Sequence, residues 1–172
     1  MKKIFLLIPY LLLLIDAPAY AQQDPQFSQY NFNKLAFNPA YAGMRQAFCV
    51  STLGRQQWTG FPGAPKNLLL STDLFLRSFG GVGLVLINDQ LGFDRTNIVK
   101  ASGSFHLPVG PGTLGLGLEA SAIQKTMGNA WVYNDSGDPS IPMNGASSTI
   151  WDMGLGAVSY THLRAHETKA NL

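Results

Sequence analysis

Two charged residues, Lys100 and Glu119, are the first candidates for chemistry in this sequence. The alternation of the residues around them predicts that they face the same way on adjacent strands. There they could act as general acid and base, or form a structural ion pair, which is the favoured interpretation. His106 lies near a predicted strand end without a carboxylate spaced for a triad. These residues therefore predict no catalytic site.

A second candidate is a histidine pair near the end of the chain. His162 and His166 are spaced i, i+4, with Glu167 adjacent, and on a helix this spacing could hold zinc. However, the surrounding stretch SYTHLRAHET (159–168) breaks the preceding strand pattern and resembles a recurrent translated adapter sequence. We therefore expect residues 160–172 to be a non-native tail rather than a zinc site.

Two further features are too weak to predict chemistry. Asp135 and Asp138 resemble half of a calcium loop, but the glutamate and the regular spacing of such loops are missing, which favours a plain turn. Cys49 is the only cysteine, which excludes an intramolecular disulfide framework and a multi-cysteine metal site. It is predicted to be a buried small residue rather than a nucleophile. No metal and no cofactor are expected.

Composition narrows the class of protein. Of the 172 residues, 46% are hydrophobic and only 13% are charged, against about 25% charged in a typical soluble domain. The net charge is +2 and there is no basic run, so a nucleic-acid partner is not supported. The chain also holds 18 glycines and 10 prolines, which disfavours long helices.

The first 21 residues have the features of a secretory signal peptide. A basic start at residues 1–3 precedes an apolar run at residues 4–15, and Ala19-Tyr20-Ala21 is a small-x-small cleavage signal. Cleavage is expected after Ala21. An uncleaved membrane anchor is the alternative, but a spanning helix needs about 20 apolar residues. The mature chain is thus expected to be exported.

From Ala47 onward the hydrophobic pattern has the period of two that is typical of strands. Each segment has one apolar face and one small or polar face. The expected strands cover residues 47–58, 66–76, 81–88, 97–107, 113–124 and a segment that starts at 150. Between them we expect tight turns at 77–80 and 108–112 and longer loops at 59–65, 89–96 and 125–149. The fold class is therefore all-β and antiparallel.

Strand length and loop alternation favour a transmembrane β-barrel over a soluble β-sandwich. The strands approach the roughly 9–11 residues that cross a bilayer when tilted, whereas soluble strands average about 5–6. Aromatic residues near strand ends suit an interfacial girdle: Trp58, Phe61, Phe75, Phe79, Phe105 and Trp151. A sandwich that buries the apolar faces remains open, because the same alternation allows it.

Three blocks of this sequence resemble the PorP/SprF family of type IX secretion system outer-membrane proteins. They are DPQFSQYNFNKLAFNPAYAG (24–43), RQQWTGFPGAPK (55–66) and GVGLVLINDQLG (81–92). The resemblance implies a transmembrane barrel larger than this chain, association with secretion and gliding machinery, and no catalytic residues or cofactor. It also implies export or surface attachment of a secreted surface protein, with other type IX components as partners. The alternative is a passive outer-membrane porin or small-solute transporter.

The expected organisation has four parts. They are a signal peptide (1–21), an irregular periplasmic N-terminal segment (22–45), a partial outer-membrane barrel (46–159) and the tail (160–172). The sheet is expected to be incomplete and open, with about five to six strands, and Lys100 and Glu119 are expected to face its lumen. The protein is expected to contact the lipid bilayer, with no nucleic acid and no small-molecule substrate.

The N-terminal segment is expected to pack against the periplasmic end of the barrel or to enter it, with one short helix around residues 30–37. Its aromatic residues are too many to leave in water without a purpose. The candidates for partner binding are Phe27, Tyr30, Asn38, Pro39 and Tyr41. Replacing Phe27 and Tyr30 by alanine is expected to impair assembly or function.

Overall fold

The computed structural model describes residues 30–78, 80–128 and 145–161. They form one antiparallel sheet of six strands in sequence order, preceded by three 3-10 turns. The turns are η1 (Tyr30–Phe32), η2 (Lys34–Ala36) and η3 (Pro39–Tyr41). The strands are β1 (Phe48–Gln56), β2 (Lys66–Leu76), β3 (Gly80–Leu91), β4 (Asp94–Val109), β5 (Gly112–Met127) and β6 (Ala146–Thr161). The expected all-β, antiparallel architecture is confirmed.

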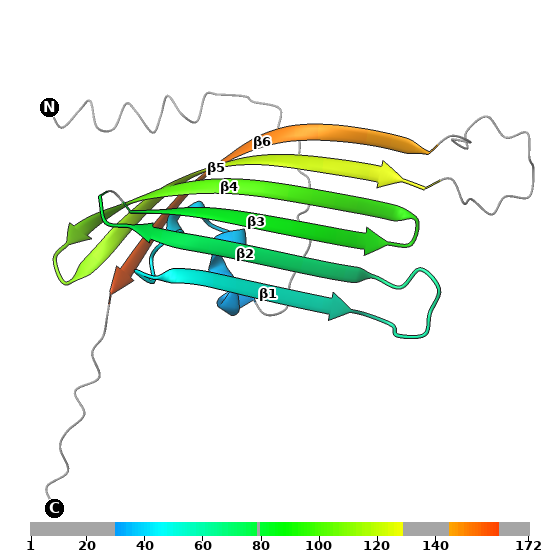
Figure 1. The fold of residues 1–172 in the computed structure, drawn as a ribbon, viewed down its shortest axis with the longest axis horizontal. Helices are drawn as coiled ribbons and strands as arrows, with labels where there is room; N and C mark the ends of the chain where they lie inside the picture. Colours follow the sequence, from blue (N-terminus) through cyan, green and yellow to red (C-terminus); the bar gives the residue numbers. More distant parts are fainter. Residues whose placement is uncertain (1–29, 79, 129–144, 162–172) are drawn as a thin grey trace, which may run out of the picture.

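The sheet is open within the described residues, because β1 and β6 are its two edges. Figure 1 shows the strands curving around the 3-10 turns, which lie against the concave face of the sheet. Contacts of η3 with β4, β5 and β6 fix this placement. The expected open sheet of five to six strands therefore has six. Within the same residues, no helix is long and apolar enough to cross a membrane.

Burial alternates along the strands with the period of two that the sequence predicts. In β4, Lys100, Ser102 and Ser104 are buried on the concave face, while Val99 and Phe105 are exposed on the convex face. The apolar face of the sheet is thus the uncovered one, and the small and polar face is covered by the N-terminal turns. A soluble sandwich would bury the apolar face instead.

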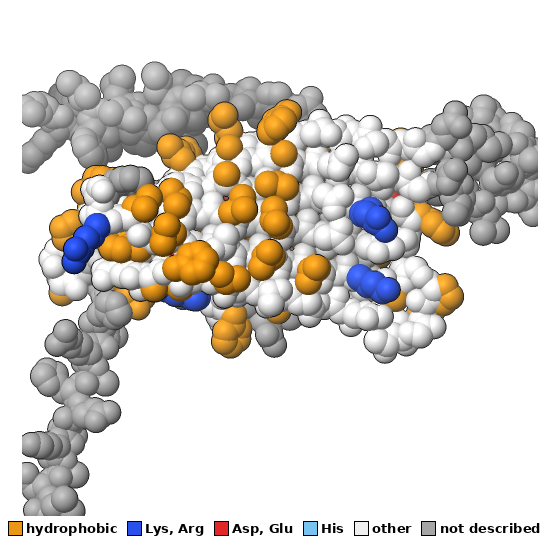
Figure 2. Space-filling view, in the orientation of Figure 1, with side chains coloured by type: hydrophobic (Ala, Val, Ile, Leu, Met, Phe, Trp, Pro, Cys, Tyr) orange, Lys and Arg blue, Asp and Glu red, His pale blue; other side chains and the backbone are white. Residues whose placement is uncertain are grey.

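The exposed apolar side chains form a band that ends abruptly. Figure 2 shows them gathered over one part of the convex face, while the part nearer the connection at residues 57–65 is largely white. The last apolar row across the sheet is Leu70, Leu86, Val99, Ala122 and Trp151. Apart from Leu68, the next row is polar and holds Asn88, Asn97, Gln124 and Thr149. In this row, Asn88 Nδ2 donates to Asn97 Oδ1 at 2.6 Å.

Two connections differ from the sequence prediction. The expected loop at 89–96 is wrong: β3 continues to Leu91 and β4 begins at Asp94, which leaves a two-residue turn at Gly92 and Phe93. Gly92 has φ +61°, a conformation that glycine adopts without strain. The expected long loop at 125–149 is shorter at both ends, because β5 reaches Met127 and β6 begins at Ala146. The expected alternation of tight turns and longer loops is therefore broken at Gly92 and Phe93, where a tight turn replaces a longer loop.

Two local expectations also need correction. The single short helix expected around residues 30–37 is instead the series of 3-10 turns, with Pro39 at the start of the third. Phe75 does not join an outer aromatic girdle, because its ring stacks on His106, with the ring centroids 6.2 Å apart, on the concave side.

β6 continues through Tyr160 and Thr161, the first two residues of the expected tail, which pair with β5.

Candidate functional site

The candidate site is the N-terminal stretch of residues 30–46, here called the docked segment, together with the sheet face beneath it. The segment cannot form an α-helix throughout because Pro39 lacks a backbone donor. Asn38 caps the third turn, since its Oδ1 accepts a hydrogen bond from the Ala40 amide at 3.0 Å. Short turns of this kind keep the backbone close to the sheet and leave it able to follow the curvature.

Apolar contacts seat the docked segment on the middle of the sheet. Leu35, Ala36 and Ala42 are buried there. They pack against four buried strand residues, namely Leu69, Val85, Ile87 and Ile98. This cluster is the core within the described residues, so the segment is an integral part of the fold rather than an exposed leader.

Glycines on the concave face let the backbone of the segment approach closely. A methyl group on Gly117 would overlap the backbone of Pro39 and Ala40, and one on Gly156 would overlap the Asn38 side chain. On the same face, a methyl group on Gly81 of β3 would overlap the Ala42 carbonyl. Strand glycines often mark such close approaches. Gly81, Gly117 and Gly156, here called the glycine seat, therefore leave room for the backbone of this segment.

Hydrogen bonds tie the docked segment to strands far apart in the sequence. Asn38 Nδ2 donates to the Ala157 carbonyl of β6 at 3.0 Å. Ser104 Oγ of β4 donates to the Ala42 carbonyl at 2.6 Å, and Asp73 Oδ2 of β2 accepts from the Gly43 amide at 3.1 Å. The segment thus bridges β2, β4 and β6 across the concave face.

Lys100 and Glu119 form an ion pair beneath the segment, with Lys100 Nζ 3.2 Å from Glu119 Oε1. The two side chains are only 11% and 10% exposed. Lys100 Nζ also donates to the Ala36 carbonyl at 3.4 Å. Both residues face the same side, as the alternation predicts, and the pair links β4 and β5 to the docked segment. The arrangement is that of a structural pair.

The partner-binding candidates fall at different places relative to this seat. Asn38 and Pro39 face the chain's own sheet, where they contact Gly156. Tyr41 is half-buried, and the Lys34 ammonium lies 5.3 Å from its ring centroid. Phe27 and the side chain of Tyr30 lie outside the described residues. Binding of a partner by these residues remains a prediction.

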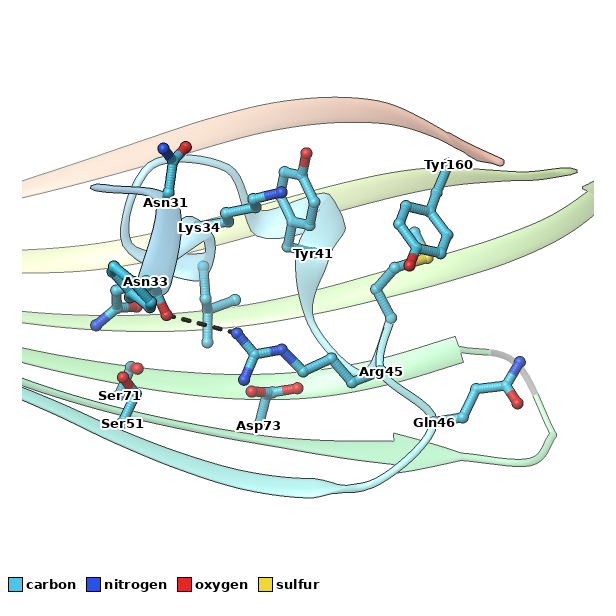
Figure 3. Close-up of a pocket in the computed structure, with 13 residues that line it drawn as sticks. Asn31, Asn33, Lys34, Tyr41, Arg45, Gln46, Ser51, Ser71, Asp73 and Tyr160 are labelled. Atoms are coloured by element: carbon cyan, nitrogen blue, oxygen red, sulfur yellow. Dashed lines mark hydrogen bonds between the residues drawn. The ribbon is translucent and has the colours of Figure 1, made fainter. Parts of the chain in front are cut away.

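A polar cavity of about 400 Å³ lies between the docked segment and strands β1 and β2. Figure 3 shows Asn33 and Arg45 reaching from the segment over Ser71 and Asp73 of the sheet. Tyr160, near the end of β6, closes another side. Arg45 Nη2 donates to the Phe32 carbonyl at 3.4 Å, within the segment itself.

Among the described residues, the other sequence candidates assemble no catalytic or metal site. Ser104 Oγ lies 3.0 Å from His106 Nε2, a pair that the sequence reasoning missed, but the hydroxyl is buried against the Ala42 carbonyl. Cys49 is a free thiol that is only partly buried. No group of three or more His, Cys, Asp or Glu side chains that could hold a metal occurs in the described part of the chain. Asp135, Asp138, His162, His166 and Glu167 lie outside that part.

Sequence reasoning also missed the close approach of the segment to these glycines and the burial of Asn33. The signal for the seat was present: β3, β5 and β6 each carry a Gly-x-Gly on the face that is not apolar, at residues 81–83, 115–117 and 154–156. Asn33 had no such signal, because an asparagine in an asparagine-rich stretch reads as a turn residue.

Comparison with known protein families identifies a match over most of the chain. The model of the family described as type IX secretion system membrane protein PorP/SprF matches residues 19–166, which include every described residue. No curated protein and no solved structure matches the chain.

Proposed function

Since the chain belongs to the PorP/SprF family of type IX secretion system membrane proteins, we propose that it acts as a non-enzymatic outer-membrane component of this system. In this role it assists the export or the surface attachment of partner proteins. Its partners are other type IX secretion components and a secreted surface protein. The signal peptide, cleaved after Ala21, takes the chain out of the cytoplasm.

One observation carries the proposal: the convex face of the sheet exposes an apolar band, while the concave face is covered. Along β4, every outward residue from Val99 to Val109 is apolar or glycine. Ten residue steps at about 3.3 Å span about 33 Å along the strand. At the tilt of about 35–45° usual in barrels, this becomes about 25 Å, the height of the apolar band of outer-membrane barrels.

The covered concave face supports a docking role over a solute channel. A porin requires a wide polar lumen with an internal ring of charges, whereas here the docked segment and the Lys100–Glu119 pair fill the space beside β4 and β5. Passive transport of small solutes remains the alternative function. A rigid wall in the membrane would leave the loops and the N-terminal segment as surfaces for partners.

Deleting the gene tests the proposal. The expected result is loss of at least one secreted or surface-attached protein of the type IX system, with solute uptake unchanged. Restoring the gene with Phe27 and Tyr30 both replaced by alanine is expected to restore secretion only in part. Normal export of every type IX substrate together with reduced solute uptake would overturn the proposal in favour of the porin alternative.

A further inference from the structure

The cavity beside the docked segment contains a buried side chain that the fold leaves unsatisfied. Asn33 is only 4% exposed, and neither Nδ2 nor Oδ1 has a hydrogen-bond partner among the described residues. Buried amide groups are normally hydrogen-bonded, because desolvation without a partner is costly. Asn33 lines the cavity of about 400 Å³ and reaches toward Ser71 in Figure 3. A ligand that enters the cavity could satisfy it.

The unpaired amide selects the chemistry of that ligand. Nδ2 offers donors and Oδ1 offers an acceptor, so a matching ligand must present an acceptor and a donor side by side. A simple anion or a simple cation supplies only one of these. An extended peptide supplies both, because the N–H and the carbonyl oxygen of one residue point the same way.

The charged groups around the cavity favour a neutral ligand, because each already interacts with the protein. Arg45 donates to the Phe32 carbonyl, and its guanidinium points toward the Asp73 carboxylate in Figure 3. Asp73 accepts from the Gly43 amide, and the Lys34 ammonium lies over the Tyr41 ring. A neutral peptide backbone would enter without disturbing these interactions.

We propose that this cavity binds a short extended polypeptide segment through its backbone, with Asn33 as the residue that pairs with the N–H and the carbonyl oxygen of one peptide residue. The volume of about 400 Å³ lies within the range of about 300–1,000 Å³ for ligand sites. That the segment comes from a partner protein rests on the proposed function. The binding chemistry does not, and its test contains no secretion step.

The test uses the full mature chain in detergent micelles, with asparagine side chains labelled for nuclear magnetic resonance. The probe is N-acetyl-trialanine methylamide, and the matched control probe is its analogue with ester links in place of the internal amides. The peptide is expected to shift the Asn33 side-chain signal in a saturable way. The ester is expected to bind about tenfold more weakly, because its internal links have no N–H to donate to Oδ1.

Two variants complete the test. Asn33→Leu is expected to weaken peptide binding about tenfold without lowering thermal stability, since it removes a buried amide that has no partner. Asn88→Leu, the same change on the convex face, is expected to leave peptide binding unchanged. Equal binding of the two probes, no saturable shift at Asn33, or a loss of stability in Asn33→Leu would each overturn the proposal and leave water as the occupant of the cavity.

Discussion

At the scale of single residues, substitutions in the ion pair of Lys100 and Glu119 measure how much this pair contributes to the unfolding free energy. Lys100→Met leaves the Glu119 carboxylate buried without its partner and removes the donor to the Ala36 carbonyl. The expected cost is about 3 kcal/mol of unfolding free energy, the lower end of the range for breaking a buried pair. Denaturant unfolding in micelles measures it.

The matched control is the double variant Lys100→Met, Glu119→Leu, which removes both charges. Its stability is expected to lie within about 1 kcal/mol of the wild type, because apolar replacement of a whole buried pair is often neutral. If the single variant were no less stable than the double variant, the pair would not be the buried structural link described above.

The glycine seat gives a second prediction at the residue scale. Gly117→Val is expected to cost about 3 kcal/mol, because its side chain would overlap the backbone of Pro39 and Ala40 and overpacking is costly. Displacement of the segment should also speed trypsin cleavage after Lys34. Gly103→Val is the control, since an added methyl group there would meet nothing within 4 Å. Equal cleavage rates in the two variants would show that Gly117 does not set the position of the docked segment.

At the scale of an element, substitutions at two positions on β5 show which part of the convex face lies in lipid. Leu118, 64% exposed, lies within the apolar band, and Gln124 lies on the same face in the polar row beyond it. Leu118→Arg is expected to lower the stability of protein folded into vesicles by about 2–4 kcal/mol, and Gln124→Arg by about 0–1 kcal/mol. In a soluble protein, the arginine at 118 would improve solubility without this cost.

At the scale of the whole molecule, the fold predicts firm membrane association. The mature chain is expected to stay in the membrane pellet after carbonate and high-salt washing, because its apolar band has no other cover among the described residues. Immunoblotting of pellet and supernatant measures this. Release by either wash would support the soluble sandwich instead.

Local pattern alone was enough to predict the strands and their two faces. The side chains of a strand alternate by covalent geometry, so the spacing of Leu68, Leu70 and Leu74 predicted the apolar face, and β2 has the predicted bounds Lys66–Leu76. The same alternation predicted that Lys100 and Glu119 share a face. It failed at 89–96, because strands that extend beyond the apolar band stay paired through their backbones and carry polar residues on both faces.

Only the tertiary structure decided which face is covered, and by what. Alternation is identical for a sandwich and for a lipid-facing sheet, so the choice depends on contacts between residues far apart in the sequence. The hydrogen bond between Asn38 and Ala157 spans 119 positions, and Ser104 reaches Ala42 across 62. A sequence pattern holds no record of such distances. The fit of the glycines to the docked segment, the burial of the ion pair and the unsatisfied Asn33 all depend on how the docked segment meets the sheet, so only folding decides them.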